Sequence, residues 1–141
     1  MENITVLGAG SWGTALAIVL AENGHNTLLW THRADQATEI NEQHTNNKYL
    51  PDITLPMNLL ATHDIKEALT HTSIVVMAVP TKAIREVCKS MMEHLDKKVL
   101  FIHVSKGIEP DSLLRISEII EQSIAPEFLE DIVVLSGPSH A

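Results

Sequence analysis

Three glycines near the start of the chain follow the spacing Gly-x-Gly-x-x-Gly, at Gly8, Gly10 and Gly13. They come directly after a short apolar run that reads as a β-strand, and they open a helical pattern over residues 12–23. In a dinucleotide-binding turn, the first glycine permits a sharp turn, the second lets a pyrophosphate approach the backbone, and the third lets the helix pack against the sheet. The N–H groups at the start of the helix then hold the phosphates. The motif alone is weak evidence, but its place between a strand and a helix predicts a dinucleotide site.

The end of the second predicted strand, Trp30-Thr31-His32-Arg33, bears on which dinucleotide would bind. Domains of this type that prefer NAD usually place an acidic residue there, where it holds the ribose 2′-hydroxyl. Here no acidic residue occurs before Asp35. Arg33 can instead donate two hydrogen bonds to a 2′-phosphate or stack on the adenine, which favours NADP(H). In the alternative interpretation Arg33 is a surface charge, and Asp35 or Glu39 contacts the ribose.

Further candidate site residues follow other predicted strands, in the clusters 78–81, 105–107 and 136–139. The carboxyl ends of parallel strands line the ligand crevice of such a sheet, so these clusters are expected near the cofactor. The backbone around Pro80 is expected along the ribose and nicotinamide. Lys106 is placed to meet a phosphate or a carbonyl oxygen, although a lysine in such a position is otherwise an ordinary exposed side chain. Tyr49 belongs to a long polar loop that either folds over the cofactor or stays on the surface.

Strand-like and helical patterns alternate along the whole chain. Strands are predicted at 4–7, 27–31, 59–61, 73–79, 99–104 and 132–135, and helices at 12–23, 34–43, 64–69, 81–94 and from 111 or 112 onward. Such alternation is typical of βαβ units. We therefore expect an α/β fold of the Rossmann type, a doubly wound, mainly parallel sheet with helices on both faces.

Composition narrows the class of protein. The 141 residues are 45% hydrophobic and 20% charged, with a net charge of −8 that argues against nucleic acid as the main partner. No apolar stretch approaches the roughly 20 residues of a membrane span, and no signal peptide is evident, so we expect a cytoplasmic protein. The histidines form no metal-binding pattern, so no metal site is expected. The single cysteine, Cys88, falls in a helical pattern and is expected to be a buried core residue.

Six short motifs resemble, in order and spacing, those of one enzyme family. They are Gly-Ala-Gly-Ser-Trp-Gly-Thr-Ala at 8–15, Leu-Trp-Thr-His-Arg at 29–33, Lys-Tyr-Leu-Pro at 48–51, Ala-Val-Pro at 78–80, Ser-Lys-Gly-Ile-Glu at 105–109 and Ser-Gly-Pro-Ser-His-Ala at 136–141. Together they resemble the N-terminal domain of bacterial-type NAD(P)H-dependent glycerol-3-phosphate dehydrogenase. The resemblance covers essentially the whole chain and is far more specific than the glycine motif.

The resemblance implies a reversible hydride transfer between NAD(P)H and the C2 carbonyl of dihydroxyacetone phosphate, giving sn-glycerol 3-phosphate for phospholipid synthesis. It also implies which residues contact the cofactor: Ser11, Trp12, His32, Arg33, Tyr49, Lys106 and Ala141. Lys106, Gly137 and Ser139 would contact the substrate on this side of the pocket. A lysine ammonium near the carbonyl can stabilise the charge that develops on its oxygen. NADPH is the expected cofactor, and NAD is the second candidate.

Members of the family continue into a mainly helical C-terminal domain, which supplies the proposed general acid/base lysine and the residues that hold the substrate phosphate. We therefore expect residues 1–141 to be one NAD(P)-binding domain of a longer protein, with no catalytic residue of their own and little or no turnover. Surfaces that normally face the second domain would expose apolar side chains, so self-association, up to a homodimer, is also expected.

Two other functions fit parts of the sequence. One is a related dehydrogenase of the 6-phosphogluconate or ketopantoate reductase kind, which shares the glycine turn. The motifs at 105–109 and 136–139 favour the glycerol-phosphate enzymes over these. The other is a regulatory module that senses NAD(P)H without catalysis, because one fold hosts many functions. A sensor would have no reason to respond to dihydroxyacetone phosphate.

Overall fold

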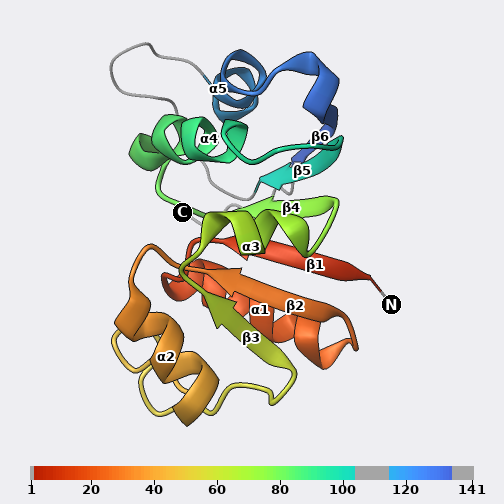
Figure 1. The fold of residues 1–141 in the computed structure, drawn as a ribbon. Helices are drawn as coiled ribbons and strands as arrows, with labels where there is room; N and C mark the ends of the chain where they lie inside the picture. The colour runs from red at the N-terminus through yellow and green to blue at the C-terminus, as the bar shows by residue number, and fades with distance from the viewer. Residues whose placement is uncertain (1, 104–114, 135–141) are drawn as a thin grey trace.

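The computed structural model describes residues 2–103 and 115–134, and within them six strands form one parallel sheet (Figure 1). The strands are β1 (Asn3–Leu7), β2 (Asn26–Trp30), β3 (Leu59–Thr62), β4 (Ile74–Met77), β5 (Val99–His103) and β6 (Leu129–Val134). The helices are α1 (Ser11–Glu22), α2 (Ala34–Gln43), α3 (Ile65–Thr70), α4 (Ile84–Met92) and α5 (Ile116–Ser123), with 3₁₀ turns at Thr81–Ala83 and Pro126–Phe128.

The strand order is β3-β2-β1-β4-β5-β6, which confirms the predicted Rossmann-type fold. β1 lies between β2 and β4, and Val6 is in register with Leu29 on one side and Val76 on the other. Both central strands are buried on both faces, as their continuous apolar sequences predict. The direction of winding reverses between β1 and β4. In open parallel sheets, the carboxyl side of such a switch point is where ligands bind.

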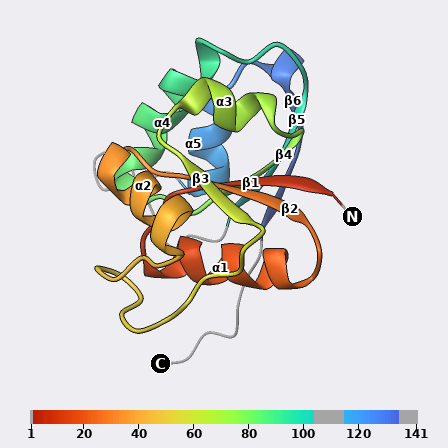
Figure 2. The ribbon, with the colours of Figure 1, turned by 60° about the horizontal axis from the view of Figure 1, so that its bottom comes forward.

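Helices lie on both faces of the sheet (Figure 2), and a hydrophobic cluster lies between the helices and the sheet on each face. Side chains of α1 and α2 pack on one face, against strand residues such as Val6 and Leu29. Side chains of α3, α4 and α5 pack on the other face, around the fully buried Phe101. Cys88 lies in this second cluster, as predicted, and burial raises the pKa of its thiol to about 12.

The predicted elements are confirmed in type and order, with differences at some ends. The helix predicted from residue 81 begins as a 3₁₀ turn, and its α-helical part is Ile84–Met92. β6 begins at Leu129, three residues before its predicted start, because pairing with β5 extends it through an exposed polar stretch. The predicted start of the last helix, at 111 or 112, lies outside the described residues.

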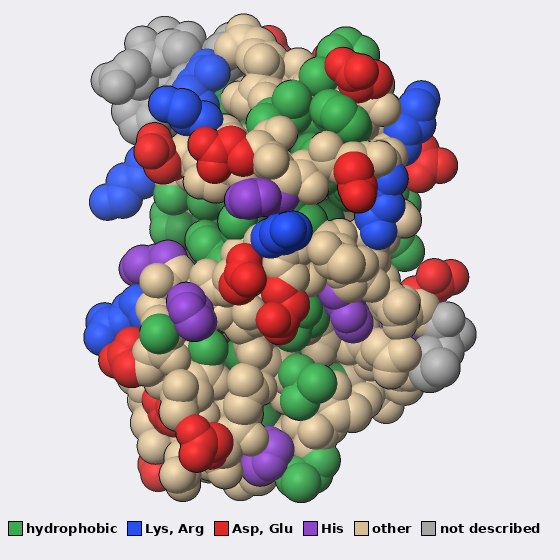
Figure 3. Space-filling model, in the orientation of Figure 1, with side chains coloured by type: hydrophobic (Ala, Val, Ile, Leu, Met, Phe, Trp, Pro, Cys, Tyr) green, Lys and Arg blue, Asp and Glu red, His purple; other side chains and the backbone are tan. Residues whose placement is uncertain are grey.

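The surface carries charges of both signs. Among the described residues on the face seen in Figure 3, Lys and Arg side chains alternate with Asp and Glu. That face therefore has no extended basic surface, as expected for a chain with a net charge of −8. None of the helices in the described ranges is both long and apolar enough to cross a membrane.

Candidate functional site

A cavity of about 680 Å³ opens at the carboxyl ends of β1, β2 and β4. Its floor is the turn between β1 and α1, and its walls come from the segment after β2, the loop before β3, and the segment from β4 into α4. Its lining residues are Gly8, Ala9, Gly10, Ser11, Trp12, Gly13, Trp30, Thr31, His32, Gln36, Tyr49, Ala78, Val79, Pro80, Ala83, Glu86, Val87 and Ser90. The volume and the mainly apolar lining suit a small organic ligand or cofactor.

Two of the three motif glycines are required by the backbone. Gly8 has a φ of +113°, and a Cβ there would lie 2.8 Å from the carbonyl carbon and oxygen of Ala78. A Cβ at Gly13 would lie only 1.9 Å from the carbonyl oxygen of Gly8. These contacts are with backbone atoms that cannot move aside easily. Gly8 therefore makes the turn out of β1 possible, and Gly13 lets α1 approach it.

Gly10 differs from its two neighbours in the motif. Its backbone is extended, with φ −76° and ψ −170°, which any residue can adopt. A Cβ at this position would meet no atom of the described protein within 4 Å. Gly10 is also the residue before α1, so the free N–H groups of the first helical turn begin next to it. The described fold thus has no steric need for glycine here, and the space it leaves opens beside the N-terminus of α1.

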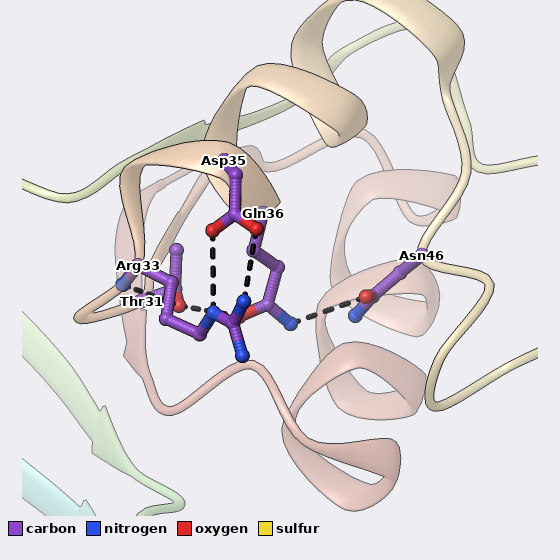
Figure 4. A network of polar contacts seen from close by, with 5 residues as sticks. All are labelled: Thr31, Arg33, Asp35, Gln36 and Asn46. Atoms are coloured by element: carbon purple, nitrogen blue, oxygen red, sulfur yellow. Dashed lines mark hydrogen bonds and ion pairs between the residues drawn. The ribbon is translucent and has the colours of Figure 1, made fainter.

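Three polar side chains, Thr31, Gln36 and Asn46, support the glycine turn, and Figure 4 shows the hydrogen bonds that join them to one another. The carbonyl oxygen of Ala9 accepts hydrogen bonds from Gln36 Nε2 at 2.7 Å and from Asn46 Nδ2 at 3.1 Å. Asn46, which is fully buried, also donates to Thr14 Oγ1 at 2.9 Å. The Thr31 hydroxyl donates to Gln36 Oε1 and so ties the end of β2 into the same network. Neither Gln36 nor Asn46 is predictable from the sequence, because nothing in a polar helix or a polar loop distinguishes one amide from its neighbours.

The loop that contains Tyr49 returns to the glycine turn. The hydroxyl of Ser11 donates a hydrogen bond to the carbonyl oxygen of Tyr49 at 3.1 Å. The backbone N–H of Tyr49 in turn donates to the carbonyl of Asn46, so the buried network fixes this part of the loop. Tyr49 thereby lies beside the cavity and contributes to its lining.

Arg33 lies beside the cavity rather than in its wall. It borders an adjoining hollow of about 70 Å³ lined by Arg33, Asp35, Gln36, Glu39, Asn46, Lys48 and Tyr49. Its Nε and one Nη donate to the two carboxylate oxygens of Asp35, at 3.2 and 2.9 Å. This hydrogen-bonded pairing raises the pKa of Arg33 and lowers the pKa of Asp35. The carboxylate of Glu39 is engaged elsewhere, accepting from Thr45 Oγ1 at 2.7 Å and from the backbone N–H of Asn47 at 2.9 Å.

The structure brings most of the predicted cofactor residues together. Those that line the cavity are Gly8, Gly10, Ser11, Trp12, Gly13, His32, Tyr49 and Pro80. Arg33 lies at the adjoining hollow, which shares Gln36 and Tyr49 with the cavity. Lys106, Gly137, Ser139 and Ala141 lie outside the described residues. Two apolar side chains also line the cavity, Ala83 from the 3₁₀ turn after β4 and Val87 from α4.

The strand order, the switch point and the glycine turn with its flanking cavity define this chain as a Rossmann-type α/β domain. A narrower assignment comes from comparison with known proteins. Residues 3–141 match the family described as the N-terminus of NAD-dependent glycerol-3-phosphate dehydrogenase, and the chain belongs to that family. This membership decides against the alternative of a 6-phosphogluconate or ketopantoate-type domain.

Individual relatives agree with the family assignment. The chain is 68% identical over all of its 141 residues to glycerol-3-phosphate dehydrogenase (NAD(P)+) of Lysinibacillus sphaericus. Among solved structures, it resembles glycerol-3-phosphate dehydrogenase from Coxiella burnetii at a TM-score of 0.85 and 36% identity over 99% of the chain. The enzyme from Saccharomyces cerevisiae gives a TM-score of 0.84 at 29% identity, again over 99% of the chain. In each comparison the chain spans 42% of the other protein's length.

Proposed function

We propose that this chain is the cofactor-binding part of a glycerol-3-phosphate dehydrogenase, and that it holds NADPH, or less tightly NADH, in the cavity above the glycine turn. The protein as a whole would catalyse reversible hydride transfer with dihydroxyacetone phosphate, giving sn-glycerol 3-phosphate. The family assignment and the enzyme names of the relatives support this activity. Phospholipid synthesis in the cytoplasm is the setting in which that product would be used.

The observation that carries the proposal is the space at Gly10. Gly8 and Gly13 are accounted for by backbone contacts, whereas a side chain at Gly10 would meet nothing. A pyrophosphate that approaches the backbone at the start of α1 explains why this position has no side chain. The cavity above is large enough to take the rest of a dinucleotide along the ends of β2 and β4.

The residues around the cavity would each contact a different part of the cofactor. The N–H groups at the start of α1 would hold the pyrophosphate, and Pro80 and Val79 would pack along the ribose and nicotinamide. The apolar side chains of Ala83 and Val87 would offer a flat wall to the adenine, while Arg33 would meet the 2′-phosphate. When bound, the nicotinamide supplies the hydride that reduces the ketone.

The family resemblance also supports a proposal for the substrate, which would be held by Lys106, Gly137 and Ser139. Lys106 would in addition stabilise the charge that develops on the carbonyl oxygen of the substrate.

Titration of NADPH and NADH into the protein, followed by nucleotide fluorescence, tests this function. We expect Gly10→Ala to weaken both cofactors at least about tenfold, equivalent to about 1.4 kcal/mol of binding free energy, because the methyl group occupies the pyrophosphate space. The thermal midpoint should stay unchanged, because the same methyl group meets no protein atom. Arg33→Ala should weaken NADPH and leave NADH nearly unaffected. Undiminished binding by Gly10→Ala would contradict the proposed pyrophosphate site.

A further inference from the structure

The pairing of Arg33 with Asp35 places two opposite charges at the edge of the proposed cofactor site. Both nitrogens of the contact face one carboxylate, so the arrangement is side-on and two-pronged. The pair remains open to solvent, with 47% of the Arg33 side chain and 72% of the Asp35 side chain exposed. The hydroxyl of Thr31 accepts from the backbone N–H of Arg33 at 3.2 Å and fixes the start of this segment to the end of β2.

The two members of the pair recognise different cofactors. A guanidinium suits the dianionic 2′-phosphate of NADPH, because its planar fork donates to two oxygens at once. A carboxylate suits the free 2′-hydroxyl of NADH, because the hydroxyl can donate to it. The same carboxylate repels a phosphate, and Asp35 already occupies two of the five N–H donors of Arg33. NADPH must therefore share or displace Asp35 before it gains the full contact with Arg33.

Other charged residues of the hollow do not duplicate this role. Glu39 is held by Thr45 and Asn47, which direct its carboxylate toward the loop. The Nζ of Lys48 lies 5.4 Å from the centre of the Tyr49 ring in a cation–π contact, and both residues line the same hollow. Asp35 is thus the carboxylate that bears directly on Arg33.

We propose that Asp35 is a specificity-determining residue that holds Arg33 back from the 2′-phosphate and keeps NADH acceptable. This inference rests on the proposed function, since it assumes a dinucleotide in the cavity. Its physical content is a competition between two anions, the Asp35 carboxylate and the 2′-phosphate, for one guanidinium. Because both charges are exposed, the competition is screened by salt and should be strongest at low ionic strength.

Asp35→Asn removes the charge of the competitor and keeps the shape of the side chain. We expect NADPH to bind about five times more tightly at low salt and NADH to bind about two times more weakly, so that the preference shifts by about tenfold. At about 0.5 M salt the shift should shrink to within about threefold, because the Debye length falls below the size of the site. The dissociation constants of both cofactors for the purified protein, measured at the two salt concentrations, give this ratio.

Glu42→Gln is a matched control, because it removes one exposed carboxylate from the same helix, away from the cavity and the hollow. It should leave the ratio unchanged. In an Arg33→Ala background, Asp35→Asn should lose most of its effect on NADPH, since the competition needs the guanidinium. An effect of similar size in that background would show general charge repulsion and overturn the proposed mechanism.

The experiment distinguishes a failure of the proposed role of Asp35 from a failure of the proposed cofactor site. If both cofactors bind and Asp35→Asn behaves like Glu42→Gln, the inference is overturned while the cofactor site stands. Equal shifts for NADPH and NADH, accompanied by a lower thermal midpoint, would show that Asp35 serves only the helix start, and would also overturn it. If the unmodified protein binds neither cofactor, the proposed function falls and the inference with it.

Discussion

On the α1–α2 side of the sheet, polar side chains hold the glycine turn beside the hydrophobic cluster of that face, whereas on the α4–α5 side the helices are held mainly by hydrocarbon packing. Asn46 and Gln36 contact the turn at a named atom, the carbonyl oxygen of Ala9. Phe101, Ile119 and their neighbours fill volume with no comparable directional demand. Apolar packing tolerates exchange of similar shapes, but a buried hydrogen bond tolerates almost none, because an unmatched polar group loses its hydration without replacement.

The difference explains where the site lies. A cofactor site needs backbone N–H groups and carbonyls held at fixed positions, and directional bonds fix positions better than dispersion contacts do. The proposed pyrophosphate position lies directly above the amide network. The hydrocarbon side contributes bulk stability and, through Ala83 and Val87, one apolar wall.

Of the substitutions considered, Gly13→Ala is expected to disrupt the glycine turn most severely. Its methyl group would lie 1.9 Å from the Gly8 carbonyl oxygen, so α1 would have to move away from the turn. We expect a loss of more than about 4 kcal/mol of unfolding free energy, at the extreme of single substitutions, and no measurable cofactor binding. Urea unfolding followed by circular dichroism measures the first, with Gly10→Ala as the matched glycine change. A Gly13→Ala midpoint equal to that of Gly10→Ala would contradict the geometry of the turn.

Asn46→Ala removes one of the two amides of the network and leaves the glycines of the turn in place. Two donated hydrogen bonds disappear, to Ala9 and to Thr14, and we expect a cost of about 2 kcal/mol. Cofactor binding by the folded protein should weaken about tenfold, because the turn is less well fixed. Asn47→Ala, the same change one residue later at an exposed side chain, is the control. Equal unfolding free energies for Asn46→Ala and Asn47→Ala would contradict the interpretation that the network supports the turn.

The hydrocarbon side should respond least to a conservative exchange. Phe101→Leu removes part of a fully buried ring from the centre of its cluster, and the neighbours can close in. We expect a cost below about 1.5 kcal/mol and unchanged dissociation constants for both cofactors in the folded protein. Urea unfolding and fluorescence titration measure these two quantities. A change in cofactor affinity as large as that of Asn46→Ala would mean that the two sides are not distinct in the way proposed.

Much of this architecture could be predicted from local patterns. Apolar strands and amphipathic helices repeat with their own periods, and the glycine spacing carries a steric meaning that the structure reproduces at Gly8 and Gly13. The amide network could not be predicted. Asn46 and Asn47 are adjacent and chemically identical, yet one is fully buried and the other exposed, because only the folded loop decides which one faces the turn.

Contacts made only in the folded chain also bear on two other sequence-based expectations. Glu39 is a candidate ribose ligand in the sequence, and in the structure one of its carboxylate oxygens accepts from Thr45 and from the backbone of Asn47 in the loop after α2. The early start of β6 at Leu129 comes from pairing with β5 rather than from alternation within its own sequence. At β6 a tertiary partner overrides what the local residues indicate.

The hydrogen bonds that support the glycine turn also constrain the order in which the chain can fold. The two side chains that bind the Ala9 carbonyl come from positions 27 and 37 residues further along the chain. A nascent chain that has formed only β1 and α1 therefore has the motif but not its support, and loop closure over that span must come first. The turn therefore gains its support only after that span has closed. A nucleotide that binds only the completed turn would then bias the chain toward its finished form, by about 2.7 kcal/mol at a hundred times its dissociation constant.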